Sequence, residues 1–333
     1  MSTRNPEVVV ITGASAGVGR ATVREFARRK AHIGLLARGI DALEVARREV
    51  EEAGGKALVL PTDVAHADQV EAAAERVERE LGPIDVWINN AMNSVFSPVK
   101  KMQAEEYKRV TEVTYLGSVY GTLSALKRML PRDRGSIVFV GSALAYRGIP
   151  LQSAYCGAKH AMQGFFDSLR TELMHDKSNI RITMVQLPAL NTPQFGWVKT
   201  RLRGEPRPMG KIFQPEVAAR AIYWAAHNDR RELYVGFPTA YAIVGNKVAP
   251  WYADQVLSEQ GVEGQQQEEP VEPDRPHNLW EPLPGDHGAH GSFDDQAHRF
   301  SPHAWASMHR GLLALVGAGL AGAMIGSKVV RRD

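Results

Sequence analysis

The chain has 333 residues but a single cysteine, Cys156, which excludes an internal disulfide bond and any metal site built from several cysteines. It also lacks an excess of charge of either sign, because 40 basic residues stand against 37 acidic ones. This balance does not favour a nucleic-acid-binding protein. No apolar stretch with a cleavage site follows the first residues, so we expect no secretory signal. The hydrophobic content of 44% is typical of a folded globular chain.

What the sequence does contain is a regular alternation of two patterns. Short apolar runs predict β-strands at Val8–Ile11, Ile33–Ala37, Ala57–Leu60, Val86–Ile88, Ile137–Val140, Arg181–Leu187 and Glu232–Val235. Between them lie helical patterns at Asp41–Ala53, Ala67–Leu81, Ala104–Leu130, Ser153–His175 and Pro215–Ala226. Strands that alternate with helices indicate βαβ units. We therefore predict an α/β fold, a doubly wound parallel sheet, in a single domain over residues 1–258 with a C-terminal extension.

The composition changes at the end of this domain. Residues 259–310 contain ten acidic and three basic residues, so the rest of the chain has a net charge of +10. Six of the eleven histidines also fall here, but their scattered spacing does not predict a metal site. The segment has few aliphatic side chains, so it can bury too little apolar surface to offset the loss of chain entropy on ordering. We expect a loosely ordered acidic linker, with four aromatic residues available to dock it on the domain: Trp280, Phe293, Phe300 and Trp305.

An apolar helix is predicted over residues 311–330. Gly311–Ser327 has no charged residue, and its length approaches the roughly 20 residues of a membrane span only if Lys328–Val330 is added. Small residues recur every four positions, as in membrane helices that pack closely, at Ala314, Ala318, Gly322 and Gly326. A cytoplasmic domain would place the terminal basic residues across the membrane, against the usual charge bias. A membrane anchor, an interfacial helix and a helix docked on a partner subunit therefore all remain open.

A glycine-rich turn follows the first predicted strand. Thr12–Gly19 has the spacing TGxxxGxG and precedes a helical pattern, and it contains Gly13, Ser15, Gly17, Val18 and Gly19. Glycines allow the backbone to approach a pyrophosphate, and a helix N-terminus offers free N–H groups. The second strand ends at Arg38, where an acidic residue would bind the ribose 2′-hydroxyl of NAD and an arginine suits the 2′-phosphate of NADP. We therefore expect NADP(H) to be preferred over NAD(H).

A second group of residues indicates acid–base chemistry. Tyr155 and Lys159 are four positions apart in a predicted helix, so they share one face. A nearby ammonium favours the phenolate, and such a tyrosine can exchange a proton with a carbonyl or alcohol oxygen. Ser142 follows the strand Ile137–Val140, at the edge where ligands bind in open α/β sheets, and could hold the same oxygen.

Together these motifs resemble the short-chain dehydrogenase/reductase family, with its Rossmann fold, over roughly residues 6–250. The resemblance also includes Asp63–Val64, Asn89–Ala91 and the segment Pro188–Thr192. It implies that Asp63 and Val64 hold the adenine, that Asn90 and Ala91 line the cofactor's path, and that Pro188 and Thr192 flank the nicotinamide. It further implies that Tyr155 is the general acid/base, that Lys159 binds the nicotinamide ribose and lowers the tyrosine's pKa, and that Ser142 orients the substrate.

The sequence departs from the family pattern at three places. Met92 replaces the glycine of NNAG, Ala189 replaces the glycine of PGxxxT, and Thr114 occupies the place of the family's helix asparagine in a proton relay. We include Thr114 among the candidate catalytic residues with a rearranged relay. The segment Pro193–Phe213, where the family places a substrate loop, has five basic residues against one acidic residue. It predicts either a basic lid for an anionic substrate or a solvated loop.

The sequence thus predicts an NADP(H)-dependent oxidoreductase that transfers hydride between nicotinamide and a carbonyl or secondary alcohol, a ketoreductase in one direction. Two alternatives remain open: a catalytically impaired NADP(H)-binding protein, and a membrane-tethered interaction protein. The expected partners are a small-molecule substrate, further copies of the chain in a homo-oligomer, and a membrane through residues 311–330. We expect a cytoplasmic location with membrane association through that segment.

Overall fold

The computed structural model describes residues 6–311, 313 and 314. At its centre lies a seven-stranded sheet in the order β10-β7-β6-β4-β1-β2-β3, with every neighbouring pair parallel. Its strands are β1 (Val8–Thr12), β2 (His32–Ala37), β3 (Ala57–Pro61), β4 (Val86–Asn89), β6 (Ser136–Ser142), β7 (Arg181–Leu187) and β10 (Glu232–Tyr234). Each strand coincides closely with the apolar run that predicted it, and the doubly wound α/β class is confirmed.

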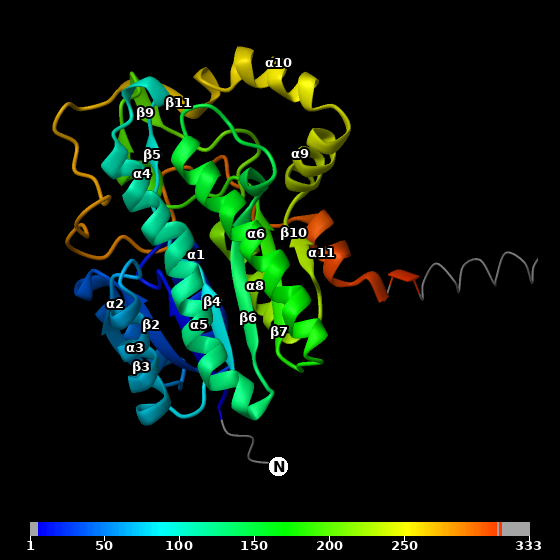
Figure 1. Cartoon of the computed structure of the whole chain (residues 1–333). Helices are drawn as coiled ribbons and strands as arrows, with labels where there is room; N and C mark the ends of the chain where they lie inside the picture. The colour runs from blue at the N-terminus through cyan, green and yellow to red at the C-terminus, as the bar shows by residue number, and fades with distance from the viewer. Residues whose placement is uncertain (1–5, 312, 315–333) are drawn as a thin grey trace, which may run out of the picture.

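Helices pack on both faces of this sheet, and Figure 1 shows α5 and α6 in front of it. One face is covered by α1 (Gly17–Ala27), α2 (Ile40–Glu52) and α8 (Pro215–His227), the other by α3 (Ala67–Glu80), α5 (Gly117–Met129) and α6 (Ser153–His175). Successive residues of a strand point to opposite faces, so Val9 joins the first core and Val10 the second. Because parallel strands end at one edge, the loops after β1, β4 and β6 converge there.

The helical pattern predicted over Ala104–Leu130 is helical throughout in the structure, but it contains a π-helical turn that the sequence did not indicate. The structure has α4 (Ala104–Thr111), a π-helical turn over Glu112–Leu116, and then α5. Thr114 lies in this turn, and its hydroxyl is bonded to the backbone of Asn93 outside the helix. The helical periodicity of the sequence predicts which face of a helix is apolar. It does not predict a side-chain contact such as that between Thr114 and Asn93. Wide turns of this kind occur frequently at functional sites.

Smaller elements lie beyond the edge where the strands end. Two short sheets pair β5 (Val95–Phe96) with β8 (Lys199–Thr200), and β9 (Gly204–Pro206) with β11 (Gln266–Pro270). The remaining helices are α7 (Gln194–Trp197), α9 (Phe237–Val248), α10 (Pro250–Gln260) and α11 (Pro302–Met308). The helix α10 runs across the predicted boundary at residue 258, and β11 belongs to the expected linker.

The segment expected to be a loosely ordered linker instead packs along the domain. In Figure 1 it is the orange chain that leaves β11 at the upper left, passes above α2 and reaches α11 on the right. Its side chains Leu279, Ala289, Phe293 and Ala304 are each at most 3% exposed, whereas Trp280 is 42% exposed. A few buried apolar side chains and ion pairs to the more basic domain hold the segment, and its overall composition does not reveal them.

The predicted apolar helix over residues 311–330 lies almost wholly outside the described residues, because 312 and 315–333 are not described. Among the described helices, none has the length and apolar character needed to cross a membrane. The candidate membrane anchor therefore stays a prediction.

Candidate active site

A cavity of about 680 Å³ opens at the edge where the parallel strands end. All predicted site residues except Thr114 line it: Gly13, Ser15, Gly17, Val18, Gly19, Arg38, Asp63, Val64, Asn90, Ala91, Ser142, Tyr155, Lys159, Pro188 and Thr192. They come from the loops that follow β1, β2, β3, β4 and β7, from the first turn of α1, and from β6 and α6. The fold therefore gathers residues that are up to 179 positions apart in the chain into one cleft.

The glycine turn has the close packing that a nucleotide phosphate site requires. Gly13 has φ +68°, and a Cβ atom at Gly19 would lie 1.9 Å from the Gly13 carbonyl oxygen, so neither position accepts a side chain without movement. The Asn90 amide donates to the Thr12 carbonyl oxygen at 2.8 Å and ties this turn to the end of β4. Helix geometry leaves the N–H groups of the first turn of α1 without intrahelical partners. These features fit the pyrophosphate of a dinucleotide.

Three of the four candidate catalytic residues, Ser142, Tyr155 and Lys159, line the cavity near the end of β6. The Ser142 hydroxyl accepts from the Leu144 N–H at 3.1 Å, which fixes it at the edge of the sheet. Lys159 is 3% exposed and donates to the Val140 carbonyl oxygen at 2.6 Å. Its ammonium nitrogen lies 5.6 Å from the centroid of the Tyr155 ring. One phenol, one hydroxyl and one amine therefore line the same cavity.

The expected lowering of the Tyr155 pKa by Lys159 is not what the structure gives. Burial raises the pKa of the Tyr155 phenol, and the Ser142 hydroxyl opposes this only in part. Burial also lowers the pKa of Lys159 to about 7, because the low-dielectric surroundings disfavour its charged form. The Lys159 ammonium itself donates to the Val140 carbonyl oxygen. Tyr155 is therefore a protonated acid at neutral pH.

Thr114 does not reach the cavity. It is fully buried, and its hydroxyl both donates to the Asn93 carbonyl oxygen and accepts from the Asn93 N–H, each at 3.1 Å. Its neighbour Val113 lines the cavity instead. Thr114 therefore stabilises the strand-end loop at Asn93, and the structure gives it no contact with the other candidate catalytic residues.

The adenosine end of the cleft contains Arg38 and Asp63. The Arg109 guanidinium donates to the Asp63 carboxylate at 2.6 Å. Burial opposes ionisation of Asp63, but the bonds from Arg109 and the Ala65 N–H outweigh it and lower the pKa of the carboxyl. Arg38 donates to the backbone carbonyl oxygens of Asn278 and Trp280. Both residues predicted to read the adenosine are thus held by other parts of the chain.

The five basic residues of the segment Pro193–Phe213 do not line the cavity. Glu106 of α4 accepts from Arg201 at 2.7 Å and pairs with Lys199 at 2.9 Å. The loop residues that line the cavity are instead uncharged, and they include Val198, Pro208, Met209 and Gly210. Of the two expectations for this loop, the basic lid over an anionic substrate therefore has no support from the described contacts.

Several cavity residues were missed by sequence reasoning. They are Trp197 of α7, Pro238, Thr239, Tyr241 and Ala242 of α9, and Asn278, Pro282, Leu283, Gly285 and His287 of the C-terminal segment. The segment was read as a linker because of its average composition. The signal that could have found it is local: Pro282, Pro284 and Gly285 restrict and turn the chain beside Leu279 and Trp280.

Comparison with known proteins agrees with this site. Residues 7–201 match the family model described as short chain dehydrogenase, and these residues include every candidate catalytic residue. The chain belongs to the short-chain dehydrogenase family and is an oxidoreductase of that type. The resemblance inferred from the motifs is confirmed.

Curated relatives match different shares of the chain. An uncharacterized oxidoreductase, YxnA of Bacillus subtilis, is 31% identical over 80% of this chain and 76% of its own length. A 3-dehydrosphinganine reductase of Danio rerio is 32% identical over 64% of this chain and 66% of its own. Dehydrogenase/reductase SDR family member 7 of Homo sapiens is 38% identical, with half of each chain matched.

Solved structures with the same fold contain nicotinamide nucleotides. A metagenomic short-chain oxidoreductase in complex with NADP is 25% identical and has a TM-score of 0.59 over 69% of this chain and 96% of its own. An alcohol dehydrogenase of Thermococcus sibiricus, complexed with 5-hydroxy-NADP, is 27% identical with a TM-score of 0.59 over 68% and 95%. Almost the whole of each neighbour is thus matched by about two thirds of this chain.

Proposed function

We propose that this protein is an NADPH-dependent reductase of ketones or aldehydes with an apolar body. The observation on which the proposal rests is that Ser142, Tyr155 and Lys159 line the same cavity as the glycine turn. The NADP complexes of the two structural neighbours and the name of the Danio rerio relative support the cofactor and the direction. Arg38 at the end of β2 supports NADPH over NADH, because an arginine suits a 2′-phosphate.

The chain's own residues would bind the cofactor and the substrate and would supply the proton. Bound NADPH would supply the hydride to the carbonyl carbon. Ser142 would hold the carbonyl oxygen, and Tyr155 would donate its phenolic proton to that oxygen as negative charge develops there. The raised pKa of Tyr155 keeps the proton in place until the oxygen becomes basic enough to take it. Lys159 would bind the nicotinamide ribose from its buried place beside Val140.

The substrate class follows from the other half of the cavity. Its lining is mainly apolar, with Ile149, Val198, Met209 and Ala242, while Lys199 and Arg201 of the loop are paired with Glu106. An anionic substrate would meet no opposite charge there, whereas an apolar chain or ring would bury its surface. Roughly 25 cal/mol is gained for each Å² of apolar surface buried.

The test begins with the full chain, titrated with NADPH and NADH by nicotinamide fluorescence, and continues with a panel of apolar and anionic carbonyl compounds. Tyr155→Phe should lower kcat by roughly 100-fold or more while NADPH binding changes little, because general acid catalysis contributes about 10²–10⁴. Tyr252→Phe on α10, outside the cavity lining, is the matched control. If NADPH binds but no carbonyl compound is reduced, the catalytically impaired alternative is supported instead.

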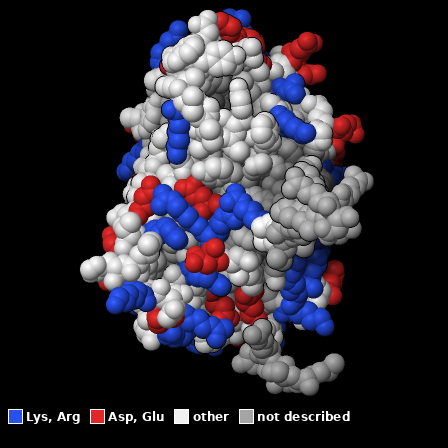
Figure 2. All heavy atoms as spheres, turned by 90° about the vertical axis from the view of Figure 1, so that its right-hand side faces the viewer, with Lys and Arg blue, Asp and Glu red and all other residues white. Residues whose placement is uncertain are grey.

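Membrane association is a second proposal, and a lipid bilayer is the partner. One face formed by α9 and α10 exposes large apolar side chains: Phe237 (66%), Tyr241 (62%), Val244 (54%), Val248 (78%), Trp251 (71%) and Tyr252 (53%). Figure 2 shows a largely uncharged area over the upper half of this side of the molecule. The Phe237 ring lies 6.4 Å from that of His303 in α11, which precedes the uncharged stretch Gly311–Ser327 in the chain. The apolar face is therefore in contact with α11, the helix that comes before this stretch in the chain.

Vesicles of phosphatidylcholine test this contact. Full-length protein should sediment with them, and Val248→Glu combined with Trp251→Glu should weaken binding at least tenfold. Leu123→Glu replaces a residue that is 56% exposed on α5, so it is a control for added charge. Equal vesicle binding by the control and the double variant would exclude the α9–α10 face as the contact.

A further inference from the structure

The C-terminal segment contacts the cleft over its adenosine and pyrophosphate half. We define residues 278–290 as the strap. Five of its residues line the cavity together with the glycine turn and Arg38: Asn278, Pro282, Leu283, Gly285 and His287. The strap therefore forms part of the boundary of the space that the dinucleotide fits.

Both ends of the strap are anchored in the domain. At its start Leu279 is fully buried among Val95, Val110 and Ala158, and its carbonyl oxygen accepts from the Arg109 Nε at 3.1 Å. Just after its end, Phe293 is 3% exposed. These two buried side chains fix where the strap begins and ends.

The second anchor is also bonded to the nicotinamide side of the cleft. The Phe293 N–H donates to the Asn191 side-chain oxygen at 3.0 Å, and the Asn191 amide donates to Asp294 at 2.8 Å. Asn191 lies next to Thr192, which lines the cavity. His290 adds a hydrogen bond with the Glu216 carboxylate of α8 at 2.7 Å.

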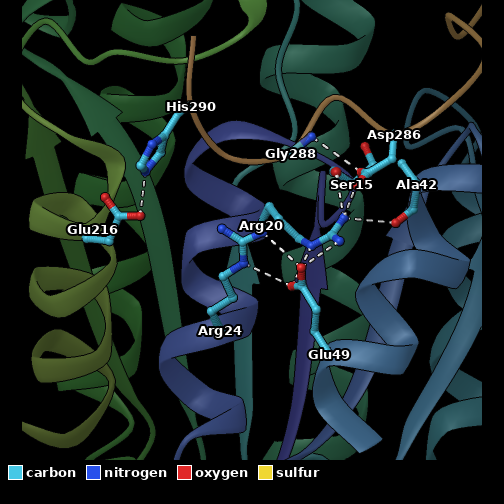
Figure 3. A network of polar contacts seen from close by, with 9 residues as sticks. All are labelled: Ser15, Arg20, Arg24, Ala42, Glu49, Glu216, Asp286, Gly288 and His290. Carbon is cyan, nitrogen blue, oxygen red and sulfur yellow. Dashed lines mark hydrogen bonds and ion pairs between the residues drawn. The ribbon is translucent and has the colours of Figure 1, made fainter. Parts of the chain in front are cut away.

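Between the anchors, the strap contacts the glycine turn itself. Figure 3 shows Asp286 beside Arg20, whose guanidinium donates to it at 3.1 Å, while Glu49 binds the same arginine from the other side. The Gly288 carbonyl oxygen accepts from the Gly17 N–H at 3.0 Å. Gly17 begins α1, so its N–H has no partner within the helix. The strap supplies that partner and so occupies one of the N–H donors at the start of α1.

The strap also sets the direction of Arg38. Its two Nη atoms donate to the carbonyl oxygens of Asn278 and Trp280, so the guanidinium is held by backbone rather than by a carboxylate. An arginine has five N–H donors, and those not used by the strap stay available for an anion. Its bonds to the strap are to neutral carbonyl groups, so the guanidinium keeps its positive charge at the adenosine end of the cleft.

We propose that the strap is a cofactor-binding element that closes over the adenosine and pyrophosphate half of the dinucleotide and must lift for the dinucleotide to enter or leave. This inference rests on the proposed function, because it needs a nicotinamide dinucleotide in the cleft. The central part of the strap is suited to such movement. Gly285 and Gly288 have φ angles of +85° and +62°, and Asp286 and Gly288 supply its polar contacts to α1.

A disulfide staple tests whether the strap must move. A Cβ atom built at Gly39 would lie 3.4 Å from the Cβ of Pro282, close to the spacing of about 3.8 Å between bridged cysteines. Gly39 has φ −82°, which any residue adopts. The variant Gly39→Cys with Pro282→Cys should therefore join the strap to the loop after β2 when oxidised. The native Cys156 is 6% exposed and does not compete.

The readout is NADPH binding followed by stopped-flow fluorescence, with and without dithiothreitol. The oxidised protein should bind NADPH at least tenfold more slowly than the reduced protein, and protein loaded before oxidation should release it at least tenfold more slowly. Equal rates in both redox states would overturn the proposal. If wild-type protein binds neither NADPH nor NADH, the proposed function itself fails, and that result is distinct from equal rates.

A single substitution provides an independent measurement. Asp286→Ala removes the strap's contact with Arg20 while Glu49 still neutralises that arginine, so NADPH should dissociate several-fold faster. Asp295→Ala is the matched control, because Asp295 is exposed on the same segment. Hydrogen exchange of residues 281–290 should slow when NADPH is bound to the wild type. Unchanged dissociation in Asp286→Ala together with unchanged exchange would contradict the proposal.

Discussion

Replacing Glu106 by glutamine should destabilise the protein strongly, although the change removes no heavy-atom volume. The Glu106 carboxylate is fully buried and accepts from Arg201 at 2.7 and 3.0 Å, from Lys199 and from the Gln103 N–H. Glutamine would place an NH₂ group against cationic donors. The carboxylate thus joins α4 to the loop that covers the substrate half of the cavity.

The size of the expected loss of stability follows from the pKa of the Glu106 carboxyl group. Hydrogen bonds from Arg201, Gln103 and Lys199 outweigh burial and lower the pKa of Glu106 from 4.5 to about 2. At 1.36 kcal/mol per pKa unit, the folded state gains about 3 kcal/mol from the ionised form. Because the folded pKa is depressed, this stabilisation is complete above pH 4.5 and is lost as the pH falls towards 2.

Urea denaturation at pH 7 and pH 3 measures this difference. Glu106→Gln should lower the free energy of unfolding by about 3 kcal/mol at pH 7 and by less than half of that at pH 3, where the unfolded wild type has already taken up its proton. Glu105→Gln is the matched control, because Glu105 is the exposed neighbour on the same helix. A loss below 1 kcal/mol at pH 7, or a loss independent of pH, would refute the reasoning.

Two further substitutions test other parts of the site. Arg38→Gln should reduce the preference for NADPH over NADH by roughly tenfold or more, since a hydrogen bond to a charged group contributes about 1.5–3 kcal/mol; the exposed Arg48→Gln on α2 is the control, and fluorescence titration is the measurement. Thr114→Val should cost roughly 2–4 kcal/mol of stability by leaving the backbone N–H and carbonyl of Asn93 unpaired, whereas Thr114→Ser should retain both bonds. Equal urea midpoints for the two threonine variants would contradict the role assigned to that hydroxyl.

The sequence predicted the sheet and which residues line the cleft because both depend on local patterns. Apolar runs such as Arg181–Leu187 are buried on both faces and coincide with their strands. The glycine turn and the spacing of Tyr155 and Lys159 fix their own geometry within one turn or one helix. These signals lie within about ten residues, where the periodicity of one element determines which side chains share a face.

What could not be predicted depends on contacts between distant segments. The π-helical turn at Thr114 is held by Asn93, and the direction of the half-buried Arg38 is set by carbonyl oxygens about 240 positions away. Neither contact changes the hydrophobic pattern of its own segment. The strap was misread for the same reason: its average composition is that of a linker, while two buried side chains, Leu279 and Phe293, determine its place.

The position of the strap in the chain affects how the protein is made. A ribosome releases the sheet, the glycine turn and Tyr155 long before it reaches Asp294, and domains generally fold from the N-terminal side during synthesis. The contacts of Asn191 with Asp294 and Phe293, and that of Gly17 with Gly288, can form only after the C-terminal segment has been synthesised. A nascent chain would thus contain a folded central sheet with an open nucleotide cleft. It would become able to retain a nucleotide only at the end of synthesis. A chain cut at residue 258, where the composition changes, would stay in that open state.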